Sequence, residues 1–130
     1  VHGFASSIGG YFDIAHGIFC SSLMPGANTV TIRKLRAEKT NPGAIQKYAT
    51  IGELFSQKKS MTADYYVDDF LSLLSNWTEQ MNIPTLAQCG VLLTDYAKIV
   101  EATDNKNNPV PLNRDEMMEV LENACTRQQN

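Results

Sequence analysis

The chain has 130 residues, a hydrophobic fraction of 43% and a formal net charge of −3. This length fits one domain and allows a buried core without disulfide or metal staples. The mild negative charge and the lack of a basic run give no electrostatic footprint for nucleic acid or an anionic membrane surface.

The three cysteines, Cys20, Cys89 and Cys125, are scattered and form no CxxC pair. They do not make a disulfide framework, so we expect a reducing compartment and a cytoplasmic protein. The apolar runs are far shorter than the ~20 residues that a membrane span needs. The chain starts at Val1 and enters a patterned segment at once, which suggests a fragment of something longer.

The first predicted element is a short helix that carries His2. His2 and Ser6 are four residues apart, so they share a face of any helix they occupy, and Gly9-Gly10 should end that helix. The chain can then turn and bring His16 back beside His2. Gly17 leaves room there for a close backbone or ligand approach.

The next two elements follow from local sequence. Residues 29–32 are β-branched and alternate as in a short strand, but they are isolated among helices, so we predict helix there. A helix is also predicted from Pro42, since Asn41 is a good cap and proline suits the first helical position. Its buried stripe is expected to comprise Ile45, Tyr48, Ile51, Leu54 and Phe55.

The remaining chain is also helical in period. The clearest helix runs from about Thr62, a plausible N-cap, to Met81, and Pro84 follows its end. A shorter helix is predicted over 94–102. The last begins at Asn113, with Glu116 three residues on, which is an Asn-headed analogue of the capping box. The helical period therefore predicts an all-α fold in a single domain.

Both histidines of the chain lie in its first twenty residues. Two imidazoles from adjacent elements suit a borderline divalent metal such as Fe²⁺ or Zn²⁺, because each neutral ring offers one nitrogen lone pair. The alternative is two unconnected histidines, one capping a helix and one on the surface. Spacing alone leaves both interpretations open.

The sequence around these histidines reads HGFASSIG from His2, then GYFDI, then AHG, with a glycine after each histidine. Later segments read YATIG from Tyr48, MNIPTL from Met81 and NPVPL from Asn108. In order and spacing, these segments resemble the iron-containing (group III) alcohol dehydrogenase family. The resemblance covers essentially the whole chain and implies the helical, bundle-like C-terminal domain of the dehydroquinate synthase-like fold.

The resemblance also implies roles for particular residues. His2 and His16 would be two of the family's four metal ligands, the other two lying upstream of this chain. Ser6 stands where several members carry a histidine near the nicotinamide and substrate, although it could equally be a small residue that eases helix packing. Phe12 is a candidate for the wall of the substrate pocket.

Three further residues near His16 have expected structural roles. Asp13 is either an acceptor that orients a ligand or, as we favour, a cap for the helix that starts near Ala15. Ala15 replaces the family's usual proline, which loosens the approach to His16. Cys20 is expected to be a small buried residue on that helix and not a ligand.

The implied activity is reversible hydride transfer between an alcohol and NAD or NADP, with Fe²⁺ or Zn²⁺ polarising the alcohol oxygen. The cofactor would be held by an N-terminal nucleotide-binding domain, of which this chain carries no glycine-rich fingerprint. The implied partners are that domain, a small alcohol or aldehyde, and a second copy in a homodimer. We expect the isolated chain to be inactive and to hold metal weakly.

Two other interpretations remain open. Glycerol dehydrogenase and dehydroquinate synthase share the superfamily and use zinc at the domain cleft, although the FDIAHG and NPVPL segments fit the alcohol dehydrogenase branch better. From another class, the chain could be a non-enzymatic helical interaction module with incidental histidines. The upstream gene sequence would discriminate among these.

Overall fold

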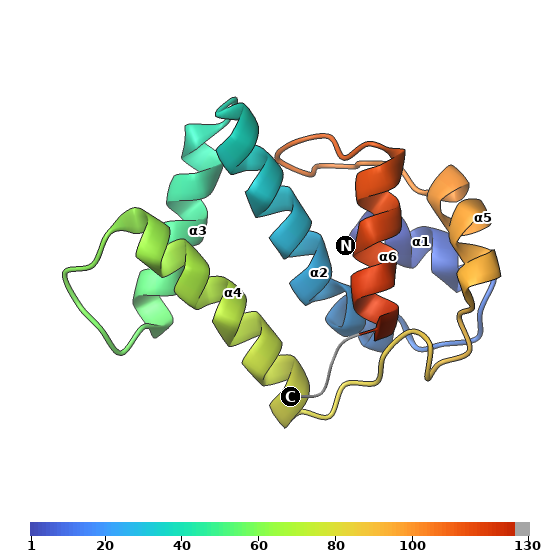
Figure 1. The fold of residues 1–130 in the computed structure, drawn as a ribbon. Helices are drawn as coiled ribbons and strands as arrows, with labels where there is room; N and C mark the ends of the chain where they lie inside the picture. Colours follow the sequence, from blue (N-terminus) through green and yellow to red (C-terminus); the bar gives the residue numbers. More distant parts are fainter. Residues whose placement is uncertain (127–130) are drawn as a thin grey trace.

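Helix α2 is the longest element, and it lies between two groups of helices (Figure 1). The computed structural model describes residues 1–126. These residues form helices and contain no strand, which confirms the predicted all-α fold. The helices are α1 (His2–Gly9), α2 (His16–Glu38), α3 (Pro42–Phe55), α4 (Ala63–Gln80), the short 3-10 helix η1 (Leu93–Asp95), α5 (Tyr96–Ala102) and α6 (Arg114–Thr126).

Three predicted helix starts are confirmed by their caps. The Asn41 side chain accepts a hydrogen bond from the Ala44 N–H at 3.1 Å, and the Thr62 hydroxyl accepts one from the Tyr65 N–H at 3.2 Å. At α6 the capping box is reciprocal. Asn113 Oδ1 accepts from the backbone N–H of Glu116 (2.9 Å), and Glu116 Oε2 accepts from the backbone N–H of Asn113 (2.7 Å).

The ambiguous segment 29–32 lies inside α2, so the helical prediction there is confirmed. Val30, Thr31 and Ile32 are all buried. Because α2 contacts α1, α3, α4 and α6, these β-branched side chains meet helices on several sides of α2. Burial on several faces explains why the segment has no clear helical period in the sequence.

The predicted buried stripe of α3 is wrong in its second half. Ile51, Leu54 and Phe55 are exposed. The buried residues of this helix are small ones, Ala44, Ala49 and Gly52. Gly52 lies directly against the backbone of Tyr66, where an added Cβ would overlap the carbonyl oxygen. The small residues let α3 and α4 approach closely, and this close packing turns the larger residues outward.

The main core holds α1 in place. Phe4, Ala5 and Ile8 of α1 belong to the same buried cluster as Phe19 and Leu23 of α2. On its other side α1 contacts α5, where the hydroxyls of Ser7 and Thr103 lie 2.8 Å apart. These contacts fix the start of α1 relative to the start of α2. Within residues 1–126, none of the helices is long and apolar enough to cross a membrane.

Candidate metal centre

His2 and His16 are the first residues of α1 and α2, and the structure places their rings side by side. The imidazole centroids are 5.8 Å apart and the ring planes are tilted by 53°. The turn after α1 is closed by hydrogen bonds from the N–H groups of Tyr11 and Phe12 to the carbonyl of Ile8. Residues 10–15 thus lead the chain back beside the start of α1, and they bring together two histidines that are fourteen positions apart. The Gly9-Gly10 pair predicts this end of the first helix.

A third donor, Cys20, lies with the two rings, although the sequence predicts a buried structural role for it. Cys20 Sγ lies 3.4 Å from His16 Nε2, one turn further along α2. One ligand atom from each of His2, His16 and Cys20 lies within 4.8 Å of the others. Cys20 is half-buried, not fully buried as expected. The signal that could have found it is the spacing of His16 and Cys20, because residues four apart share a helical face.

This donor set fits a divalent metal ion. Imidazole nitrogen is a ligand for iron and zinc, and a cysteine thiolate is a ligand for zinc. Both histidines are exposed, so a cation can reach them from solvent. The three donor atoms are close enough together to share one ion and come from two helices that pack against each other.

Ser6 lies one turn after His2 on α1, as predicted, and it is exposed. Its hydroxyl donates a hydrogen bond to the backbone carbonyl of His2 at 3.0 Å. Because the side chain is exposed, the alternative of a small residue that eases helix packing is wrong. A role for Ser6 toward substrate stays a prediction.

The loop before α2 differs from expectation at Asp13. The N-cap of α2 is Ala15, and no side chain forms a cap hydrogen bond there. Asp13 is exposed two residues before that cap, so the favoured capping role is wrong. Phe12 is half-buried against the main core, with the Lys98 ammonium 5.3 Å from its ring centroid. Its predicted role as a pocket wall stays a prediction.

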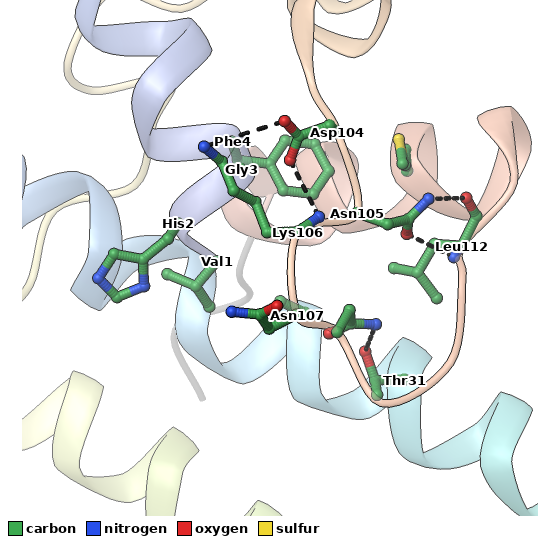
Figure 2. Close-up of a pocket in the computed structure, with 13 residues that line it drawn as sticks. Val1, His2, Gly3, Phe4, Thr31, Asp104, Asn105, Lys106, Asn107 and Leu112 are labelled. Carbon is green, nitrogen blue, oxygen red and sulfur yellow. Dashed lines mark hydrogen bonds and ion pairs between the residues drawn. The ribbon is translucent and has the colours of Figure 1, made fainter. Parts of the chain in front are cut away.

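A cavity of about 310 Å³ lies beside the first turn of α1. Its walls include residues 1–4 and the loop 104–108. Figure 2 shows the imidazole of His2 extending away from that loop. In the loop, Asp104 Oδ1 accepts a hydrogen bond from the backbone N–H of Lys106 at 2.9 Å. The cavity therefore borders the backbone at His2, while the ring of His2 faces His16.

Comparison with known proteins gives the family. The sequence model of the "Fe-containing alcohol dehydrogenase family, C-terminal" matches residues 1–125. No curated protein matches this sequence significantly. Among solved structures, that of a 1,3-propanediol oxidoreductase is similar in fold, with a TM-score of 0.78 and 22% sequence identity. The similarity covers 95% of this chain but only 31% of that one, so this chain spans about a third of that protein's length.

The family match and the fold agree with the resemblance noted in the sequence. The matched residues include α1 to α5, both histidines and Cys20, and they extend through α6 to Cys125, one residue before its end. The solved structure has the same helical arrangement, and at 22% sequence identity this similarity is evidence for the fold alone. The chain belongs to the Fe-containing alcohol dehydrogenase family, as its C-terminal domain.

Proposed function

We propose that this chain is the metal-binding part of an NAD(P)-dependent alcohol dehydrogenase, which interconverts an alcohol and an aldehyde or ketone by hydride transfer. The pairing of His2 and His16, with ring centroids 5.8 Å apart, is the observation that carries this proposal. Family membership supports the oxidoreductase class. The paired rings support a metal-assisted reaction within it.

In this proposal His2 and His16 each present a ring nitrogen to Fe²⁺ or Zn²⁺. The bound ion supplies Lewis-acid chemistry, which lowers the pKa of the alcohol and stabilises the developing alkoxide. Ser6, one turn along α1, can donate or accept a hydrogen bond on the substrate side. Phe12 would contribute an apolar wall, which excludes water from the reacting carbon.

The remaining parts of the site would come from outside this chain. NAD or NADP would be held by an N-terminal nucleotide-binding domain, and two further ligands would complete the family's set of four. The substrate, a small alcohol or aldehyde, would occupy the cleft between the two domains, where such pockets commonly form. We expect the complete enzyme to be a homodimer and the isolated chain to lack dehydrogenase activity.

The test uses the full-length protein encoded by the gene, beside the 130-residue chain alone. Reduction of NAD and NADP is followed with a panel of simple alcohols, and metal content is measured by elemental analysis. Replacing His2 or His16 by alanine should remove the metal. The loss in kcat/KM should be at least about a thousandfold, since several kcal/mol of transition-state stabilisation disappear.

Two results would contradict the proposal. One is turnover of NAD(P) with a simple alcohol by the isolated chain, which would show that no further domain is needed. The other is a full-length enzyme that keeps its metal and its activity when both histidines are replaced. A Cys89→Ser variant is a suitable control for the general effects of a substitution. Cys89 is a half-buried residue of the loop after α4, and it lies outside the cluster of His2, His16 and Cys20.

A further inference from the structure

We propose that Cys20 is a third metal donor, so that His2, His16 and Cys20 form a nitrogen–nitrogen–sulfur site that prefers Zn²⁺. This proposal rests on the proposed function, because it takes the two histidines as ligands and adds a sulfur to them. It also changes an expectation drawn from the sequence. With three donors in place, the isolated chain should bind zinc instead of holding metal weakly.

The distance between the two donors on α2 fits a shared ion. In tetrahedral zinc sites Zn–S is about 2.3 Å and Zn–N is about 2.0–2.1 Å, which puts sulfur and nitrogen roughly 3.5 Å apart. Cys20 Sγ and His16 Nε2 are 3.4 Å apart. A simple hydrogen bond between thiol and imidazole has a similar length, so this alternative must be separated by experiment.

The backbone holds these donors in a recurrent arrangement. His16 and Cys20 are four residues apart on α2, the spacing by which a single helix presents two zinc ligands in HExxH sites. His2 comes from the start of α1, so the third donor approaches from a separate helix. The three donor atoms come from two helices and lie within 4.8 Å of one another, close enough to share one ion.

The number and type of donors indicate the metal and its state. In the isolated chain, these three donors leave the fourth position of a tetrahedral zinc site to water. A thiolate is a soft ligand and favours zinc over harder ions such as Mg²⁺ or Mn²⁺. One thiolate and two neutral imidazoles leave a net charge of about +1 on the bound ion.

The test measures Co²⁺ binding to the isolated chain, because cobalt substitutes for zinc and reports its ligands by absorption. The chain is used with its N-terminus acetylated, so that the Val1 amine cannot act as a further nitrogen donor. We expect one cobalt per chain, a thiolate-to-cobalt charge-transfer band in the near ultraviolet, and loss of that band when Zn²⁺ is added.

Three variants assign the ligands. Cys20→Ser should abolish the charge-transfer band and weaken cobalt binding at least tenfold, with helicity unchanged by circular dichroism. Cys89→Ser is the matched control, because it removes another half-buried thiol away from the cluster, and it should keep the band. His2→Ala should weaken binding while any residual cobalt still shows the sulfur band.

Each contrary outcome overturns a defined claim. If cobalt binds without the charge-transfer band, or if Cys20→Ser keeps it, Cys20 is not a ligand, and the histidine pair of the proposed function still stands. If the folded chain binds no cobalt, the three-donor site is absent from it. The proposed function is then judged separately, by the metal content of the full-length histidine variants.

Discussion

Gly3 packs directly against the backbone carbonyl of Asp104, so α1 meets the loop after α5 without space for a side chain. A Cβ at Gly3 would overlap the Asp104 carbonyl oxygen. Because His2 is the preceding residue, this contact helps to fix where the first histidine is held. A Cβ at Gly17, the glycine after the second histidine, would meet nothing within 4 Å apart from the adjoining backbone of its own helix.

Replacing Gly3 by alanine should lower the free energy of unfolding by about 1–3 kcal/mol, since overpacking forces backbone shifts. It should also weaken cobalt binding at His2. Urea denaturation and cobalt titration measure the two effects. Gly17→Ala is the control, and it should leave stability unchanged or raise it by up to about 1 kcal/mol. Equal stabilities for the two variants would refute the close contact.

Two leucines test the corrected packing of α3 and α4. Leu74 of α4 is 6% exposed, whereas Leu54 of α3 is 74% exposed. We expect Leu74→Ala to cost about 2–5 kcal/mol by leaving a cavity, and Leu54→Ala to stay within about 0.5 kcal/mol of the parent. Thermal or urea unfolding measures both. A large loss at Leu54 would support the stripe expected from the sequence instead.

Asn41 has two structural roles that substitution can separate. Its side-chain oxygen caps α3, and its amide donates a hydrogen bond to the carbonyl of Pro109 at 3.1 Å. Asn41→Asp keeps the cap but loses the donor, so it should destabilise less than Asn41→Ala, which loses both. The alanine variant should cost about 1–2 kcal/mol in urea unfolding. Equal losses for the two variants would mean that the cap contributes nothing, and an aspartate variant as stable as the parent would mean that the bond to Pro109 contributes nothing.

Acid should weaken the packing of α2 on α6. Arg33 donates two hydrogen bonds, 2.6 and 2.7 Å long, to the carboxylate of Glu119, and these hold the pKa of Glu119 below its ordinary value of 4.5. A lowered folded-state pKa contributes stability that is present above the unfolded value. That contribution is lost as the pH falls through the folded value.

The expected profile is therefore a fall in the free energy of unfolding below about pH 4.5, measured by urea titrations across this range. Glu119→Gln should lie within about 1 kcal/mol of the parent at neutral pH, because the pair is partly exposed. The gap between the two proteins should close in acid. A gap that stays constant down to pH 3 would show that Glu119 does not contribute to the acid sensitivity.

Local chemistry made most of the fold predictable. Asn41, Thr62 and Asn113 were recognised as caps because a cap needs only the residue itself and the N–H groups two or three positions on. The buried face of α3 was not predictable in this way. It depends on how closely Gly52 approaches Tyr66, fourteen residues later in another helix. The positions of the large apolar side chains therefore predict the wrong buried face for the second half of α3.

The candidate site was predictable to the same extent. The glycine-flanked histidines and the turn between them could be predicted from the sequence, and the structure places their rings together. The sequence predicts a buried position for Cys20 because free cysteine is usually buried. Asp13 was assigned as a cap from its residue type, but α2 begins two residues too late for it to act. The error at Asp13 depends on where α2 starts, whereas Cys20 is half-buried against the main core and also lies beside His16, a position that depends on which face α2 presents.

Residues 10–15 link the end of α1 to the start of α2. His2 lies at the opposite end of α1 from this link, whereas His16 directly follows the link as the first residue of α2. Surface loops normally tolerate insertions and deletions during evolution. Adding or removing a residue here would change the distance that this link can span, and would therefore displace the start of α2 relative to α1. It would thus separate His16 and Cys20 from His2, so the length of this loop should be under as much selection as the ligands themselves.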